Sequence, residues 1–378
     1  MRKKYIDKLV RCIGETGLDA VMVCPGEELQ FLLGFSPMLC ERFQGLFVKK
    51  NGEMFYICNL LYQEELQKKF LEAISVGNRG NEIKQGMKIP VYSWFDGEVM
   101  TGVVEEVLKE QGLLGKRIGV NSDAQAFNVL EIMDRVDVTF CNAKPLLEEM
   151  RIQKDEEELE ALRKSASIVD QVFEEVQAVI RPGITEKEVQ NFLLRRMCKL
   201  GGQSPECIVG VGANSSYPHY CDCRGVIQEQ DVVLLDYGCT WQGLYSDMSR
   251  TVFVGGATEK QRECYELVKR SNEAAEAMVK EGAWIPDIDR KAREVLDEKG
   301  YAKTLINRLG HGIGYTIHEA PDIKQSNRRT LEKGMAFSIE PGIYLGGEFG
   351  IRIEDIVIVN EKGEAEVLNK APKEFMIL

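Results

Sequence analysis

The chain has 378 residues, of which 44% are hydrophobic and 29% are charged, so it is long enough for two soluble globular domains. Its formal net charge of -12 argues against nucleic acid and anionic membranes as partners, because both carry negative charge themselves. The eleven scattered cysteines, the lack of an evident signal peptide and the lack of a long apolar run indicate a cytoplasmic protein with reduced thiols.

Residues 1–150 are predicted to alternate between strands and helices. Residues 47–58 are expected to form a hairpin whose tight turn is Asn51-Gly52. Residues 117–141 then predict a strand, a helix and a second strand. This part of the chain contains no histidine, so we expect a smaller α/β domain for packing or oligomerisation, not for catalysis.

An amphipathic helix is predicted just after the domain boundary at residue 150. Seven apolar residues recur there at alternating spacings of 3 and 4, which places them on one stripe of a helix. They are Leu159, Leu162, Ala166, Val169, Phe173, Val176 and Ile180. Arg181, Pro182 and Gly183 are expected to stop the helix. The stripe also suits a coiled-coil seam, but its length favours a helix packed on a sheet.

The remainder of the chain shows signs of an internal duplication. Three pairs of similar positions are separated by 99 residues each. These pairs are Gly183 and Gly282, Gly201 and Gly300, and His219 and His318. We therefore expect two copies of a unit made of two helices followed by strands, and such copies can bring equivalent side chains to one central site.

The first copy contains an acidic hairpin in residues 231–255. It is expected to turn at Gln242-Gly243. That turn places Asp236 and Asp247 on the same face of the hairpin, as diagonal neighbours on adjacent strands. Both carboxylates would then reach the same ion.

The second copy offers two further carboxylates in apolar surroundings. Glu340 ends one expected strand, and Glu354 lies inside an alternating one with Arg352 on the same face. Each carboxylate alone is better explained by a position at a sheet edge or by an arginine partner than by metal binding. Four carboxylates at one site would repel one another, however, and two divalent cations would neutralise them.

Two of the three histidines occur in the segment LGHGIGYTIHEAP, residues 309–321. Its glycines argue against a helix, and a regular strand would send His311 and His318 to opposite faces, so we expect an irregular strand or a shaped loop. The imidazole of His311 would complete an oxygen-rich ligand set that suits Mn²⁺ best, with Co²⁺, Zn²⁺ or Fe²⁺ as alternatives. Two such ions about 3.5–4 Å apart form a hydrolytic centre.

These segments resemble the metallopeptidase family with the pita-bread fold, which includes methionine aminopeptidases, Xaa-Pro aminopeptidases and prolidases. The resemblance runs in order through residues 151–370 and is carried by LLDYG, LYSDMSRT, GHGIGYTIHEAP, IEPGIY and GIRIEDIVIV. It implies an α+β protein in which residues 151–378 form a pita-bread domain, with duplicated α-α-β units related by a pseudo-twofold axis around a curved antiparallel sheet. Residues 1–150 resemble the creatinase-type domain that precedes it in the proline-directed members.

The resemblance also implies the roles of individual residues. The ligands of two divalent metal ions would be Asp236, Asp247, His311, Glu340 and Glu354. His219 and His318 match the histidines that line the substrate pocket, and Glu340 would also be the proton shuttle. Arg352 would hold the ligands in place by hydrogen bonding. The implied reaction is hydrolysis of Xaa-Pro bonds, in dipeptides or at peptide N-termini, by a hydroxide that bridges the two ions in a homodimeric enzyme.

One position departs from the family pattern. Many of these peptidases have a histidine four residues before the metal-binding histidine, but this chain has Asn307 there, which cannot carry a proton at neutral pH. Two other functions therefore stay open: a two-metal hydrolase or lyase for a small non-peptide substrate, and a peptide-binding pseudoenzyme. Cys221 and Cys223 lack a second cysteine pair and are interpreted as structural or incidental.

Overall fold

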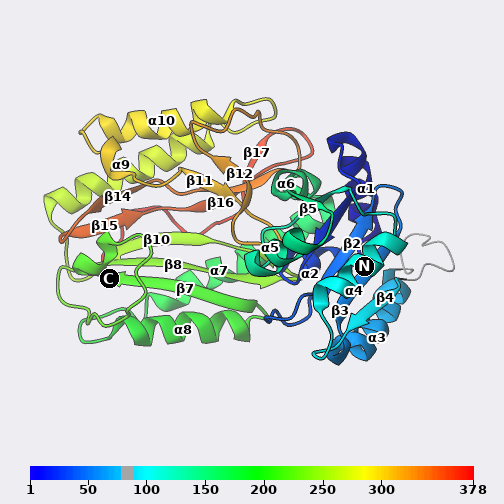
Figure 1. The fold of residues 1–378 in the computed structure, drawn as a ribbon. Coiled ribbons are helices and arrows are strands. Elements are labelled where there is room, and N and C mark those ends of the chain that lie inside the picture. The colour runs from blue at the N-terminus through cyan, green and yellow to red at the C-terminus, as the bar shows by residue number, and fades with distance from the viewer. Residues whose placement is uncertain (78–88) are drawn as a thin grey trace. The chain divides into compact units, whose positions relative to one another are not determined.

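The structure is a computed structural model that describes residues 1–77 and 89–378. The chain divides into two compact units, Met1–Arg151 and Ile152–Leu378, each with its own strands and helices (Figure 1). This confirms the expected two-part architecture of mixed α and β content. In the part of the chain that the structure describes, no helix is both long and apolar enough to span a membrane.

The first unit is built on a mixed sheet of six strands in the order β4-β3-β2-β1-β5-β6. Its elements are α1 (Lys3–Thr16), β1 (Ala20–Val23), α2 (Glu27–Leu33), β2 (Gly45–Lys49), β3 (Met54–Asn59), α3 (Leu60–Gly77), β4 (Val91–Trp94), α4 (Met100–Glu110), β5 (Arg117–Val120), α5 (Ala126–Arg135), β6 (Thr139–Asn142) and α6 (Lys144–Arg151). The predicted hairpin is confirmed as the antiparallel pair β2 and β3, with Gly52 in the left-handed conformation at the turn. The predicted strand, helix and strand are confirmed as β5, α5 and β6.

The second unit contains four α-helices, two short 3₁₀ helices and eleven strands. They are α7 (Glu156–Val176), α8 (Glu186–Lys199), β7 (Gln203–Val211), η1 (Gly212–Ser216), β8 (Val232–Trp241), β9 (Leu244–Tyr245), β10 (Met248–Phe253), α9 (Glu259–Glu276), α10 (Ile285–Asp297), η2 (Ala302–Thr304), β11 (Gly310–Gly312), β12 (Glu319–Ile323), β13 (Ala336–Ile339), β14 (Gly342–Leu345), β15 (Phe349–Arg352), β16 (Asp355–Val359) and β17 (Ala365–Val367).

Helix α7 is the predicted amphipathic helix, and it packs on a sheet. It begins at the capping box formed by Asp155 and Glu158, and all seven residues of the apolar stripe are buried. The hydroxyl of Tyr237 on β8 donates to the Val169 carbonyl at 3.0 Å, which ties the helix to that strand. The helix ends at Val176, earlier than predicted. Residues 177–179 form a turn in which Val179 N–H donates to Val176 O, so the helix ends before Pro182 is reached.

Equivalent hydrogen bonds confirm the internal duplication. Gly183 donates its backbone N–H to Ile227 O, and Gly282 donates to Leu331 O in the same way. Both glycines have positive φ angles, 87° and 79°, which glycine adopts without strain. The pair α7 and α8 in the first copy therefore corresponds to α9 and α10 in the second.

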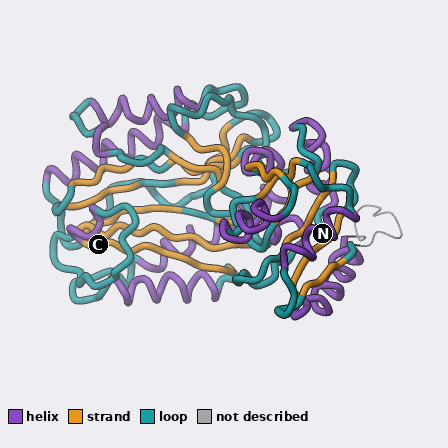
Figure 2. Tube along the Cα trace, viewed as in Figure 1, coloured by secondary structure: helices purple, strands orange, loops and turns teal. Residues whose placement is uncertain are grey.

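The strands of the second unit form three sheets. One has the order β10-β8-β7, with β9 paired to β8, a second has the order β12-β11-β13-β16-β17, and the third is the pair β14 and β15. All pairings between named strands of this unit are antiparallel, as expected, and an isolated bridge between Ser249 and Glu354 links the first sheet to the residue just before β16. In Figure 2 the helices border these strands above and below. The candidate ligands lie where the two halves meet.

Candidate metal centre

The acidic hairpin of the first copy has the register that the sequence predicts. Trp241 lies opposite Leu244, and Asp236 lies opposite Ser249 in the same register. Asp247 is therefore a diagonal neighbour of Asp236 on the same face. Gly238 lies opposite Asp247, and a Cβ atom there would come within 2.0 Å of the Ser246 carbonyl oxygen, so only glycine permits this close approach of the two chains.

The second copy differs from the prediction in the position of Glu354. The expected continuous strand is interrupted, because β15 ends at Arg352 and β16 begins at Asp355. Glu354 lies in this break, where its backbone N–H donates to Ser249 O at 3.1 Å. Glu340 directly follows β13, as expected. The break turns Glu354 from the second copy towards the hairpin of the first copy.

His311 lies on an irregular strand, which confirms one of the two expected forms. The pairing of β11 with β12 shifts register between Gly310 and Gly312. A Cβ atom at Gly310 would lie 1.9 Å from Ser338 O, so the neighbouring chain packs directly against the glycine. His311 Nδ1 lies 3.0 Å from Gly312 O, which favours a proton on Nδ1 and leaves the lone pair of Nε2 available.

Three carboxylates converge on that ring nitrogen. His311 Nε2 lies 3.5 Å from Asp247 Oδ2, 3.6 Å from Glu340 Oε1 and 3.8 Å from Glu354 Oε1. Ligand atoms of Asp247, His311 and Glu354 all lie within 4.8 Å of one another, and the three residues are buried. Asp236 is not part of this tight group, and Arg352 Nη2 donates to its Oδ2 at 2.5 Å.

Burial and mutual repulsion disfavour negative charge in this cluster. Burial raises the pKa of Asp247 well above its usual value, and the charges of Glu354 and Asp236 raise it further. Burial and the charge of Glu340 likewise raise the pKa of Glu354. Burial also raises the pKa of Glu340, from 4.5 to about 7. The His311 ring has a pKa well below its usual value, because burial and then His318 disfavour its protonated form.

These residues fit divalent metal ions. Within residues 1–77 and 89–378, the buried Oε1 of Glu354 has no hydrogen-bond partner, although it faces the other ligand atoms. A buried acceptor of this kind needs a donor or a cation. Carboxylate oxygens with a neutral imidazole suit divalent ions that accept mixed oxygen and nitrogen ligands. A cation would also remove the repulsion that raises the pKa of the carboxyl groups.

The stability gained from metal binding is expected to grow with pH. A carboxyl group with a raised pKa, such as that of Glu340, binds protons more tightly in the folded chain than in the unfolded chain. Its contribution to the stability of the metal-free protein is therefore complete below pH 4.5 and is lost as the pH rises through about 7. Metal ions replace those protons, so the increase in Tm on adding Mn²⁺ should rise between these pH values.

Thermal unfolding with and without Mn²⁺ at several pH values measures this increase. Asp247→Asn is the control, and its increase in Tm should be small at every pH because a ligand is missing. An increase in Tm of the unaltered protein that does not depend on pH would contradict the assignment of carboxylate ligands.

Arg352 and Ser249 connect the candidate ligands to one another. Arg352 is buried, so it does not form a surface salt bridge, and its Nε donates to Ser249 Oγ at 2.7 Å. The Ser249 hydroxyl in turn donates to Glu354 Oε2 at 2.7 Å, and the Tyr344 hydroxyl accepts from Arg352 Nη1 at 2.8 Å. Ser249 and Tyr344 were not among the predicted residues. The signal for Ser249 is its position two residues after Asp247, which places both on one face of the hairpin.

The remaining predicted residues lie around the cluster. The His318 ring packs edge-on against His311, with ring centroids 4.3 Å apart. Partial burial lowers the pKa of His318, and the charges of Arg308 and His219 lower it further. His219 is exposed in the loop that follows η1. Asn307 Nδ2 lies 3.4 Å from Oε2 of the candidate ligand Glu340.

The cysteines take no part in the cluster. Cys223 is buried and Cys221 is exposed, and both are free thiols. Among the residues described, the group close enough to hold a metal ion contains no cysteine. We retain the interpretation of these two thiols as structural or incidental.

Comparison with known proteins identifies a family match for each of the two units. Residues 160–361 match metallopeptidase family M24, and residues 6–153 match the creatinase/prolidase N-terminal domain. The chain is 32% identical over 366 residues to a probable dipeptidase, PepE, of Mycobacterium bovis, covering 96% of this chain and 93% of the relative. It is 31% identical over 378 residues to the Xaa-Pro dipeptidase of Pyrococcus furiosus, covering 99% and 100%. The crystal structure of a prolidase from Thermococcus sibiricus matches with a TM-score of 0.89 at 31% identity, covering 100% of this chain and 99% of that chain.

These matches confirm the family that the sequence motifs indicate. The range that matches family M24 includes all of the candidate ligands, from Asp236 to Glu354. The relatives match nearly the whole chain, so the likeness extends to both units. The chain therefore belongs to metallopeptidase family M24, and it is a metallopeptidase with a creatinase/prolidase N-terminal domain.

Proposed function

We propose that this metallopeptidase uses two divalent metal ions to hydrolyse Xaa-Pro bonds, in dipeptides or at the N-termini of peptides. The observation that carries the proposal is the convergence of three carboxylates within 3.8 Å of one imidazole nitrogen. The likeness to an Xaa-Pro dipeptidase over the whole chain supports the choice of substrate. We assign the catalytic role to residues 151–378.

The proposed ligands are those that the motifs predict: Asp236, Asp247, His311, Glu340 and Glu354. Arg352 occupies Oδ2 of Asp236, so we assign the other oxygen, Oδ1, to metal binding. The oxygen-rich ligand set favours Mn²⁺. It does not suit a structural zinc site, which prefers thiolate and histidine ligands. A homodimer in the cytoplasm remains part of the proposal, from the family resemblance and from the reduced thiols.

In the proposed mechanism, the metal ions would polarise the scissile carbonyl and lower the pKa of a water molecule towards neutrality. Glu340 accepts the proton of that water on a carboxylate oxygen and passes it to the leaving amine. His318 and His219 donate hydrogen bonds that orient the substrate and stabilise the developing oxyanion. Asn307 donates an N–H to Glu340 Oε2, but its amide neither gains nor releases a proton at neutral pH, so Glu340 transfers the proton without help from this position.

A panel of substrates tests the proposed function. Protein reloaded with Mn²⁺ is expected to release proline from Ala-Pro, with a kcat/KM at least about tenfold higher than for cleavage of Ala-Ala. Ala-Pro followed by further residues separates a dipeptidase from an aminopeptidase, because only the aminopeptidase accepts a longer peptide. Liberated amino acids are measured by chromatography, and metal-stripped protein is the control.

The same panel separates the two rival functions. Cleavage of a small non-peptide amide without cleavage of any Xaa-Pro peptide would favour a two-metal hydrolase of another substrate class. Purified protein that binds Xaa-Pro peptides but takes up no metal ions would favour a peptide-binding pseudoenzyme. Both results would contradict the proposed function.

A further inference from the structure

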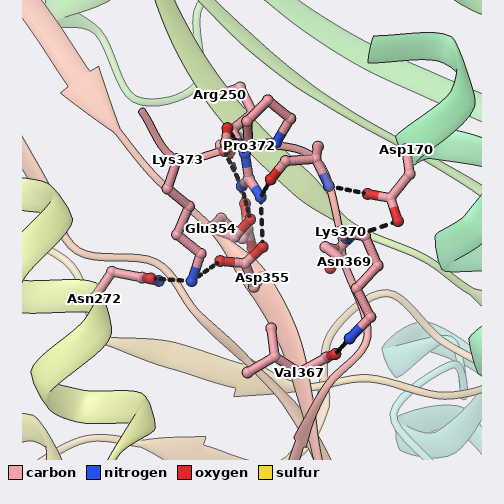
Figure 3. A network of polar contacts seen from close by, with 12 residues as sticks. Asp170, Arg250, Asn272, Glu354, Asp355, Val367, Asn369, Lys370, Pro372 and Lys373 are labelled. Atoms are coloured by element: carbon pink, nitrogen blue, oxygen red, sulfur yellow. Dashed lines mark hydrogen bonds and ion pairs between the residues drawn. The ribbon is translucent and has the colours of Figure 1, made fainter. Parts of the chain in front are cut away.

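A buried ionic network lies beside the candidate metal centre (Figure 3). Arg250 on β10 is 1% exposed, and its Nη2 donates to Asp355 Oδ1 at 2.7 Å. The other oxygen of Asp355 lies 2.7 Å from Lys373 Nζ. Lys373 also contacts Glu276 at 2.7 Å and Asn272 Oδ1 at 2.6 Å, both on α9. The network therefore joins β10, β16, α9 and the C-terminal segment.

The arginine of this network holds the backbone on which Glu354 lies. Arg250 Nη1 donates to Glu354 O at 2.7 Å and to Ser249 O at 3.0 Å. Glu354 lies in the break between β15 and β16, where its own N–H also reaches Ser249 O. The position of this candidate ligand therefore depends on bonds to Arg250 and Ser249, because no regular strand pairing continues through it.

The C-terminal segment, residues 369–373, forms hydrogen bonds with both the network and helix α7. Arg250 donates to Ala371 O at 2.8 Å and to Pro372 O at 3.2 Å. Asp170 on α7 accepts the backbone N–H groups of Lys370 and Ala371 at 2.8 and 3.0 Å. This segment thus joins α7 of the first copy to β16 of the second copy, and it places Lys373 beside Asp355.

The charges in the network balance one another. Asp355 and Glu276 are acidic, and Arg250 and Lys373 are basic. Burial alone would raise the pKa of Asp355, but the two cations hold it below its usual value. Asp355 directly follows Glu354, so without Lys373 an uncompensated buried charge would lie next to a cluster that already repels itself.

We propose that the network of Arg250, Asp355 and Lys373 positions Glu354 for metal binding and thereby sets the metal affinity of the centre. The proposal rests on the proposed function, because it requires that Glu354 binds metal. Lys373 touches none of the proposed ligands in the structure, so it is a positioning residue. Its effect reaches the centre through Asp355 and Arg250.

Lys373→Met tests the proposal, with Lys370→Met as the matched control. Lys370 lies in the same segment, but it is exposed, and its Nζ donates to the nearby Val367 O instead of to the network. Isothermal titration of metal-stripped proteins with Mn²⁺ gives the Kd and the number of bound ions. We expect the Kd to rise about tenfold or more in Lys373→Met and to stay unchanged in Lys370→Met, because loss of a residue that orients a ligand has effects of that size.

Further readouts separate positioning from general stabilisation. At saturating Mn²⁺ the KM for Ala-Pro should be unchanged in Lys373→Met, and Lys373→Arg should restore the metal affinity. Lys373→Gln keeps a hydrogen-bond donor for Asp355, so it is expected to fold even if Lys373→Met does not. It lacks the positive charge that balances Asp355, so we expect the same loss of metal affinity.

The outcomes that overturn the proposal are distinct. If Lys373→Met and Lys373→Gln bind Mn²⁺ as tightly as the unaltered protein and only their Tm falls, the network merely stabilises the fold. If the unaltered protein itself binds no metal ions, the proposed function fails, and the positioning role fails with it.

Discussion

Asp247→Asn is expected to abolish metal-dependent turnover while the fold is retained. Asp247 Oδ2 lies 3.5 Å from His311 Nε2 and belongs to the tightest group of candidate ligands. Two metal ions contribute several kcal/mol to stabilising the transition state, and about 1.4 kcal/mol corresponds to a tenfold change in rate. We therefore expect kcat/KM for Ala-Pro to fall by roughly 1,000-fold, measured alongside the metal content of the purified variant.

The stability of the metal-free variant distinguishes loss of the centre from loss of the fold. Burial and neighbouring carboxylates raise the pKa of Asp247, so its ionised form is unfavourable at neutral pH. A neutral asparagine of the same shape removes that repulsion, and the metal-free variant should have a Tm equal to or above that of the metal-free unaltered protein. Asp297→Asn, at the exposed end of α10, makes the same change of charge and should leave turnover unaltered. Near-normal turnover and metal content in Asp247→Asn would refute the ligand assignment.

The sequence predicts the first half of the centre well because β-strand alternation has a period of two. Once the turn at Gln242-Gly243 is identified, the register through Asp236 and Asp247 follows, and the structure keeps that register on both sides of a short gap at Ser246 and Asp247, between β9 and β10. Glycines at 310 and 312 likewise indicate close contact between chains, which the structure places at Ser338 and Ala320.

The sequence does not predict the break at Glu354. Alternation in residues 350–359 indicates one strand. Across the break, the side chains of Arg352 and Glu354 still contact the same hydroxyl, that of Ser249. What changes is the backbone partner, which passes from β14 to the hairpin of the other copy at Ser249 and then to β13. Side-chain periodicity carries no information about which strand is the partner.

Contacts between distant segments are also missing from a reading based on local patterns. Arg250 reaches the carbonyls of Ala371 and Pro372, about which local periodicity says nothing. Lys154 and Glu319 form a buried ion pair, although each stands in a polar or mixed segment that resembles solvent-exposed sequence. Charged residues are seldom buried unless paired, so the partner has to be known before burial can be expected.

Lys154→Met is expected to destabilise the second unit strongly. The side chains of Lys154 and Glu319 are 2% and 1% exposed, and they contact each other through Nζ and Oε1. Removal of one partner from a buried ion pair leaves the other charge uncompensated and costs about 3–5 kcal/mol. For a unit of this size we expect Tm to fall by about 6–20 °C, measured by thermal unfolding of the metal-free protein.

The pair also supports the segment that carries His318. Thr316 Oγ1 lies 3.0 Å from His318 O and 3.3 Å from Glu319 Oε2, so the carboxylate and the histidine backbone share one hydroxyl. A Cβ atom at Gly314 would lie 2.4 Å from Glu319 Oε1, which shows how closely the segment packs on the pair. Lys154→Met should therefore also lower kcat/KM for Ala-Pro, through His318.

A second substitution identifies the cause of the lost stability. If the loss of charge neutralisation at Glu319 is responsible, Lys154→Met combined with Glu319→Gln should recover most of the lost Tm, because a neutral amide replaces the buried carboxylate. Lys362→Met, at an exposed turn, should leave Tm unaltered. A double variant no more stable than Lys154→Met would show that lost packing of the lysine stem, not the uncompensated charge, determines the effect.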